Sequence, residues 1–431
     1  MAVSTNKAAS LAGKVFSFKM TACIVLGFSS GLPLYVLITL LTAYLRTQEV
    51  SLKEIGFFSL LMIPYNWKFI WSPFLDRYSL LSLGRRRSWI ALSQLLLILC
   101  IGLTGFFDVR SSLGIVAFLA LSTAFVSATQ DIAVDALRRE ILSDGELGLG
   151  NSLFVNAYRI AGLVPGGISL ILAQYLEWNK VFMITALCLL PGLIFTFMLK
   201  EPLCRTAPRT LRAAVVEPWR EFIQRRGFKH ALLILAFVFF YKLGDSMATA
   251  LATPFYIDLG YDLVTIGVVA KNVGLWSMVA GGLFGGVLML KIGINKALWI
   301  FGVGQMITIM AFWYLARSGQ GGIPSLWLFS FAVGAEALGS GMGTVAFVSF
   351  IASTTNPSFT ATQFALLTSL SALPRTFCNA ATGLIVEAVG WEHFFLLCTL
   401  LALPGMLMLL KVAPVFKTDR EVPQKNKKCR N

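Results

Sequence analysis

Nine ionisable side chains lie well inside long apolar stretches of this sequence. They are Lys68, Asp131, Asp135, Arg159, Lys242, Asp245, Lys271, Glu336 and Arg375. A charged residue at the centre of a hydrocarbon layer costs roughly 2.5–3.5 kcal/mol even on the gentler insertion scale, so each should face a partner or a watery cavity. These side chains are therefore the first candidates for binding a polar solute or carrying protons.

Two of the bases, Arg159 and Arg375, fall near the middle of their apolar stretches, at near-equivalent points of two halves of the chain. Two guanidinium groups in a wet cavity suit a ligand with carboxylates, which they can bind in a bidentate manner. Lys242 is also near the midplane, but Asp245 lies three residues further on. The two can bind a ligand or neutralise each other on one helix face, and both interpretations stay open.

The acids divide into candidates for proton coupling and candidates for structural pairing. A carboxylate in an apolar cavity can bind and release protons near neutral pH, and Asp131, Glu336 and Asp245 are the coupling candidates. Glu336 has no base on its own stretch, so the alternative is a partner on another helix. For Asp135 we favour pairing with basic residues near the inner end of its helix, which are Arg138, Arg139 or the cluster Arg85–Arg87.

The elements that carry these charges are predicted to be membrane-spanning helices. The chain has 431 residues, 57% of them hydrophobic and 13% charged, and its apolar runs match the roughly 20 residues that a helix needs to cross a bilayer. Continuous apolarity favours helices over a barrel. The expected spans are 18–45, 54–75, 88–107, 113–137, 148–175, 180–199, 230–257, 263–290, 296–316, 325–352, 360–386 and 393–411.

The formal net charge of +15 is explained by membrane topology. Most Lys and Arg residues fall in alternate loops and at the two ends, which by the positive-inside rule places both termini in the cytoplasm. This distribution disfavours nucleic-acid binding. None of the seven cysteines falls in an expected outer loop, so no structural disulfide is expected, and their spacing suggests no metal site. No hydrolytic triad is visible.

The chain reads as two related halves joined by a linker. Ile55-Gly56 and Ile266-Gly267 follow the first span of each half, and Trp178 and Trp391 open the sixth span of each. We expect an N-terminal half at 1–199, a basic cytoplasmic linker at 200–229, a C-terminal half at 230–411 and a basic tail at 412–431. Parallel six-helix repeats with substrate at the midplane are the architecture of the major facilitator fold, so twelve transmembrane helices in two pseudo-symmetric halves are predicted.

The loop between the second and third spans carries an acid and several bases that resemble the facilitator signature at this place. They are Asp76, Arg77, Arg85, Arg86 and Arg87. The predicted role is gating, in which these charges exchange partners as the halves rock, with Asp135 grouped with them. A basic cluster that only sets topology is the alternative, and both roles can hold together.

A specific family resemblance covers the chain from the first span to the twelfth. GFSSGLP from Gly27, KFIWSPFLDRY from Lys68, SATQDIAVDA from Ser127 and YKLGD from Tyr241 are similar to the AmpG muropeptide permeases, as is SFTATQFALLTSLSALPR from Ser358. The QDIA-x-D element alone also occurs in acetyl-CoA transporters. Longer family members continue into an additional pair of spans, whereas this sequence ends in a polar, basic tail.

The resemblance implies a bacterial inner-membrane permease that imports GlcNAc–anhydroMurNAc, with or without a stem peptide, on the proton gradient and with no cofactor. Its products feed peptidoglycan recycling and, in some bacteria, β-lactamase induction. Peptide carboxylates would meet the bases, including Lys68 and Lys271, while sugar hydroxyls would meet the remaining candidates: Gln130, Gln363, Tyr158 and Tyr241. A monomer in the lipid bilayer is expected.

Two other functions are alternatives to this one. A facilitator for another anionic conjugate, of the acyl-CoA or siderophore type, fits the charges but not the full-length resemblance. A membrane enzyme or sensor would need catalytic side chains gathered at one face or a soluble output domain. The sequence shows neither, so the chain is predicted to be a transporter without enzymatic activity.

Overall fold

A computed structural model describes residues 17–50, 61–80, 83–201, 210–356 and 359–414. Every regular element within these ranges is a helix. Nine helical stretches in the described residues are long and apolar enough to cross a membrane. An all-helical membrane fold is therefore confirmed, while the count of twelve spans and the side on which the termini lie stay predictions.

By packing, the chain divides into two compact units that differ from the predicted halves. The first unit comprises Met1–Pro218 and Thr355–Ser369, and the second comprises Trp219–Thr354 and Leu370–Asn431. The first unit therefore includes a short segment from late in the sequence, residues 355–369. The expected boundaries at 199 and 230 stay a prediction about the linker.

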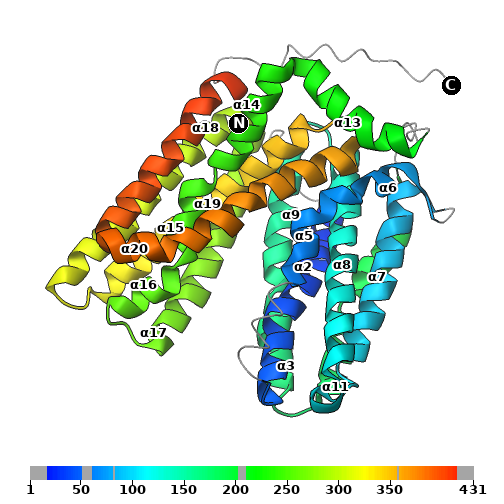
Figure 1. Cartoon of the computed structure of the whole chain (residues 1–431), viewed down its shortest axis with the longest axis horizontal. Coiled ribbons are helices and arrows are strands. Elements are labelled where there is room, and N and C mark those ends of the chain that lie inside the picture. The colour runs from blue at the N-terminus through cyan, green and yellow to red at the C-terminus, as the bar shows by residue number, and fades with distance from the viewer. Residues whose placement is uncertain (1–16, 51–60, 81–82, 202–209, 357–358, 415–431) are drawn as a thin grey trace, which may run out of the picture. The chain divides into compact units, whose positions relative to one another are not determined.

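The first unit is built from long helices interrupted by short helical segments. Their bounds are α2 Phe18–Tyr35, π-helix η1 Val36–Leu40, α3 Leu41–Thr47, α5 Ile63–Trp67, 3-10 helix η3 Lys68–Ile70, α6 Ser72–Arg77, α7 Arg85–Thr104, α8 Val109–Ile141, α9 Leu147–Ala161, π-helix η4 Val164–Ile168, α10 Ser169–Leu172, α11 Trp178–Leu187 and α12 Leu190–Met198. Within this unit α2 packs on α9, and α7 packs on α8 and α11 (Figure 1).

Glycines allow α2 and α9 to approach closely. A Cβ added at Gly27 would overlap the backbone carbonyl of Phe154, and one at Gly31 would overlap that of Tyr158. Small residues at such crossings let helix backbones meet in a membrane, where lipid tails remove the usual hydrophobic driving force. This contact holds the polar residues of α2 against those of α9.

The second expected span, 54–75, is not one continuous helix in its described part, residues 61–75. Its residues form α5, η3 and α6, with Pro64 near the start of α5 and Pro73 near the start of α6. Pro73 has no N–H to donate to the carbonyl four residues before it. The hydroxyl of Ser72 donates to that carbonyl, of Phe69, over 2.9 Å instead. Lys68 begins the 3-10 turn at this break.

The second unit contains the remaining helices, together with part of the linker helix. The bounds are α13 Leu211–Arg226, α14 Phe228–Phe240, α15 Leu243–Ala250, α16 Ala252–Asp258, α17 Leu263–Val268, π-helix η5 Val269–Gly274, α18 Leu275–Ser318, 3-10 helix η6 Gly319–Gly321, α19 Leu326–Thr354 and α20 Thr360–Val412. α13 crosses the boundary between the units at Pro218, and α20 begins in the first unit and continues into the second.

Two of these long helices contain sharp breaks at glycine. Gly293 in α18 has φ 77° and Gly390 in α20 has φ 76°, a left-handed conformation that strongly favours glycine. The breaks fall between the expected spans 263–290 and 296–316, and between 360–386 and 393–411. Gly84, which directly precedes α7, also has a positive φ, of 112°.

Candidate functional site

A buried cluster of four charges lies at the break in the second span. Asp131 and Asp135 lie one turn apart on α8, and Lys68 Nζ is 4.0 Å from Asp131 Oδ2 and 3.8 Å from Asp135 Oδ2. Ser30 on α2 donates a hydrogen bond to Asp131. Lys68, expected to bind substrate, is thus shared here between two acids.

Arg138 completes this cluster. Its Nη2 donates to Asp135 Oδ1 over 2.8 Å, so Asp135 has one of the structural partners favoured from the sequence. The guanidinium carbon also lies 3.8 Å from the ring centroid of Phe154. Two acids and two bases give the cluster no net charge, which lowers the cost of burying it.

Next to this cluster lie two candidates for sugar recognition, of which Gln130 is buried and Tyr158 is half-buried. Gln130 is 0% exposed, and within the described residues neither of its amide atoms has a hydrogen-bond partner. Tyr158 on α9 lies with its ring 6.2 Å from that of Tyr35, edge to face. Arg159 follows it in the last turn of α9 and is half-buried.

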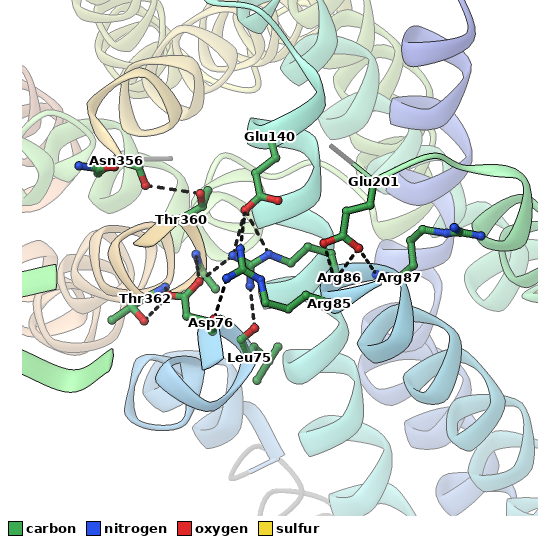
Figure 2. Close-up of polar contacts among 11 residues, drawn as sticks. Leu75, Asp76, Arg85, Arg86, Arg87, Glu140, Glu201, Asn356, Thr360 and Thr362 are labelled. Carbon is green, nitrogen blue, oxygen red and sulfur yellow. Dashed lines mark hydrogen bonds and ion pairs between the residues drawn. The ribbon is translucent and has the colours of Figure 1, made fainter. Parts of the chain in front are cut away.

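A second charged cluster of the first unit joins the predicted gating loop to α8 (Figure 2). Asp76 and Arg86 are both 0% exposed, and Arg86 Nη2 lies 2.6 Å from Asp76 Oδ1 and 3.0 Å from Glu140 Oε1. Arg86 Nη1 donates to the carbonyl of Leu75 over 2.8 Å. The planar guanidinium, with its donors fixed in a fork, therefore bridges two acids and one carbonyl.

The neighbouring arginines divide between two tasks. Arg85 Nη1 donates to the backbone carbonyl of Asp76 over 2.8 Å, so it extends the cluster. Arg87 instead donates to the carbonyls of Thr196 and Phe197 at 3.0 and 2.6 Å, at the end of α12. Arg77 lies 5.1 Å from the ring centroid of Tyr78.

Glu201 caps the start of α7. Its two carboxylate oxygens accept the backbone N–H of Arg86 at 3.1 and 3.0 Å, and Figure 2 shows it beside Arg86 and Arg87. A carboxylate at a helix N-terminus satisfies free amides and complements the helix dipole.

The Asp76 carboxylate also binds the first turn of α20. It accepts the backbone N–H groups of Ala361 at 3.3 Å and Thr362 at 2.9 Å, and the Thr362 hydroxyl at 2.6 Å (Figure 2). This N-terminal turn thus gains an acid that Arg86 holds in place. We call residues 359–369, the continuous described part of the late segment that the packing assigns to the first unit, the latch segment.

Two further contacts hold the latch segment. Gln363 Nε2 donates to the Pro218 carbonyl over 3.0 Å, and its Oε1 accepts the Asn356 N–H at 2.7 Å. Both ends of this amide are thus occupied in the described structure. Phe364 lies with its ring centroid 5.6 Å from the guanidinium carbon of Arg138.

The second unit holds the remaining candidates. Lys242 Nζ lies 2.6 Å from Asp245 Oδ2, and Ser340 of α19 donates to the same oxygen over 3.3 Å. Mutual neutralisation, one of the two interpretations of Lys242 and Asp245, is thus the arrangement seen. Glu336 is buried on α19.

The hydroxyl of Tyr241 is engaged, since it donates to the carbonyl of Leu298 over 2.9 Å. The Tyr241 ring also stacks on that of Phe347, with centroids 5.6 Å apart. Lys271 lies in η5 and Arg375 in α20, but their side chains fall outside the described part of the structure.

Several participants were not anticipated from the sequence: Ser30, Glu140, Glu201, Ser340 and Thr362. Ser30 and Thr362 lie inside family-like motifs, GFSSGLP and SFTATQF, which could have pointed to them. Glu140 and Glu201 lie at span ends, where an acid usually signals only solvent contact. Within the described residues, no group of His, Cys, Asp or Glu is placed to hold a metal ion.

Comparison with known proteins agrees with this architecture. A model of the Major Facilitator Superfamily matches residues 21–322. A Haemophilus influenzae protein described as uncharacterized is 48% identical over 96% of this chain and 98% of its own length. The anhydromuropeptide permease of Escherichia coli K12 is 41% identical over 90% of this chain and 78% of its own length.

A solved structure supports the fold. The crystal structure of the human organic anion transporter MFSD10 superposes with a TM-score of 0.68 at 15% identity, covering 90% of this chain and 98% of that one. The chain is therefore a multi-pass transporter of the inner membrane, and not an enzyme. It belongs to the major facilitator superfamily, in the family of the anhydromuropeptide permeases.

Proposed function

We propose that this protein imports anhydromuropeptides across the inner membrane for peptidoglycan recycling. The substrate is GlcNAc-1,6-anhydroMurNAc with or without a stem peptide, and alternating access is coupled to proton entry. The observation that carries the proposal is 41% identity to the E. coli anhydromuropeptide permease over 90% of the chain. The proton gradient supplies the energy, and no cofactor takes part.

The substrate site uses bases for peptide carboxylates and neutral groups for sugar hydroxyls. Arg159, Arg375 and Lys271 are the bases with this role, because guanidinium and ammonium groups pair with carboxylates. Gln130 is the best supported of the neutral groups. A buried amide with no partner is costly, and hydrogen bonds to a sugar would account for this one.

Coupling uses the buried acids. Asp131 is the leading candidate, because a single lysine, Lys68, serves both it and Asp135. Protonation of Asp131 removes one of the two negative charges that Lys68 balances. Asp135 then stays charged and paired with Lys68, so the cluster can hold the proton. Glu336 is the candidate of the second unit, while Asp245 already has Lys242 at 2.6 Å.

Gating uses the cluster around Asp76. Its carboxylate binds Arg86 and the first turn of α20 together, and charge-assisted hydrogen bonds of this kind are about twice as strong as neutral ones. Breaking the bonds to Ala361 and Thr362 frees the latch segment while Arg86 keeps Asp76 paired. The same loop also retains its bases for setting topology.

A competition assay tests the substrate class. Uptake of labelled GlcNAc–anhydroMurNAc into proteoliposomes is measured with unlabelled disaccharide, disaccharide-tripeptide, an acyl-CoA or a ferric siderophore as competitor. The proposal expects only the two muropeptides to compete, and Arg159→Ala to weaken competition by the tripeptide form more than by the disaccharide. Competition by the acyl-CoA or siderophore alone would reassign the substrate.

A further inference from the structure

We propose that Arg138 transmits the protonation state of the Asp131–Asp135 pair to the latch segment. The inference rests on the proposed function, in which Asp131 is a coupling acid, and adds the residue that connects this acid to the gate. All the contacts that support it lie within the first unit.

Arg138 contacts three elements at once. Its side chain is 2% exposed, and Nη2 donates to Asp135 Oδ1 on its own helix over 2.8 Å. The guanidinium carbon lies 3.8 Å from the Phe154 ring centroid on α9 and 5.6 Å from the Phe364 ring centroid on α20. The two rings offer the cation an alternative to the carboxylate, because a guanidinium is attracted to an aromatic face within about 6 Å.

Lys68 links Arg138 to Asp131. When both acids are charged, Lys68 is shared between them, at 4.0 and 3.8 Å, and Asp135 remains available to Arg138. When Asp131 gains a proton, Lys68 and Arg138 must share the single charge of Asp135. The guanidinium is then less neutralised, and its attraction to Phe154 and Phe364 increases.

Four further groups of the described structure face these charges. Ser30 of α2, Tyr65 of α5 and Tyr158 of α9 face Asp131, and the thiol of Cys23 is near Arg138. A hydroxyl, two phenols and a thiol stay neutral across the acidic range in which a coupling carboxylate would titrate. The proposal therefore assigns the pH response of the cluster to Asp131.

The consequence is a latch that tightens on protonation. Phe364 lies two residues after Thr362, whose N–H and hydroxyl bind Asp76 at 2.9 and 2.6 Å. A stronger hold on Phe364 keeps this turn of α20 on the first unit, so a proton on Asp131 favours the latched state. Loss of that proton weakens the hold and favours release.

Hydrogen–deuterium exchange of the latch segment tests this inference on the whole protein in lipid nanodiscs, with no substrate present. The exchange rates at pH 5.5 and 7.5 are each divided by the intrinsic exchange rate of an unstructured amide at the same pH. The Ala361 and Thr362 amides should be about tenfold better protected at pH 5.5, in line with a desolvated cation–π contact. Equal corrected protection at the two pH values would overturn the proposal.

Variants separate Arg138 from a merely structural role. Phe364→Leu and Arg138→Lys should both remove the pH dependence of protection, and Asp131→Asn should hold protection at its pH 5.5 level at both pH values. Phe182→Leu is the matched control, because Phe182 is buried in the same unit against Tyr44. It should keep the wild-type pH response.

Two outcomes contradict the inference and one addresses the proposed function alone. A full pH response in Phe364→Leu and Arg138→Lys would show that another contact carries the signal, and a full response in Asp131→Asn would show that another acid does. If Phe364→Leu or Arg138→Lys fails to fold, the remaining one of these two variants tests the contact. Absence of muropeptide uptake with the exchange pattern intact would reject the substrate and leave the role of Arg138 standing.

Discussion

At the scale of single residues, the buried charges of the first unit form two sets that are each internally matched. Lys68 and Arg138 balance Asp131 and Asp135, while Arg85 and Arg86 balance Asp76 and Glu140. Each acid thus has a base at hand, which offsets much of the desolvation cost. Such sets can change partners without leaving a charge unpaired.

Arg86 should be the most sensitive residue of the gating cluster. Arg86→Gln removes the guanidinium that Asp76 and Glu140 share, while Glu140 keeps Arg85, whose Nη2 lies 3.7 Å from Glu140 Oε1. Breaking a buried pair in this way costs about 3–5 kcal/mol. The apparent melting temperature in detergent should fall sharply. Arg87→Gln, which in the described structure removes side-chain donation to two backbone carbonyls, should shift it less, and equal shifts would contradict the assignment.

Asp131→Asn should separate exchange from accumulation. An amide keeps the shape of the protonated acid but cannot exchange a proton, so counterflow of substrate should persist while uphill uptake is lost. Asp144→Asn is the control, because Asp144 is exposed and pairs with Arg139. Proton-driven accumulation by Asp131→Asn would reject Asp131 as the coupling residue.

The sequence predicted the buried charges better than their partners. Lys68, Asp131 and Asp135 stood out because a charge inside an apolar run is costly. Ser30 and Thr362 did not, since a hydroxyl in a membrane helix can bond to its own backbone and carries no such signal. Tyr241 and Gln363 proved to be engaged with backbone groups, and only the tertiary structure could reveal this.

At the scale of elements, the spans were predictable from apolar length, while their interruptions were less so. The expected continuous span 54–75 is described as α5, η3 and α6, because Pro73 cannot donate a backbone hydrogen bond. The sequence did not indicate that Lys68 would lie at the break itself.

The contact between α2 and α9 should depend on Gly31. Gly31→Ala places a methyl group on the backbone carbonyl of Tyr158, so the helices must separate, and the cluster around Asp131 loses its support from Ser30. We expect a lower folded yield and a large loss of uptake. Gly114→Ala, with open space around it, is the control, and equal tolerance of both changes would contradict the packing argument.

At the scale of the whole molecule, the sequence divided the chain by its loops, whereas the packing places residues 355–369 with the N-terminal helices. The difference arises from a few tertiary contacts, chiefly of Asp76 with Ala361 and Thr362. No periodicity in the sequence reports a contact of that kind. The predicted halves describe the sequence repeats, whereas the two units describe how the helices pack.

The measurement that tests the account most directly is accumulation of labelled GlcNAc–anhydroMurNAc-tripeptide in proteoliposomes under an imposed inward proton gradient. We predict uptake above the external concentration, abolished by a protonophore and by Asp131→Asn, with counterflow intact in that variant. Folded protein that transports no muropeptide, or accumulates it equally without the gradient, would contradict the claim of proton-coupled import.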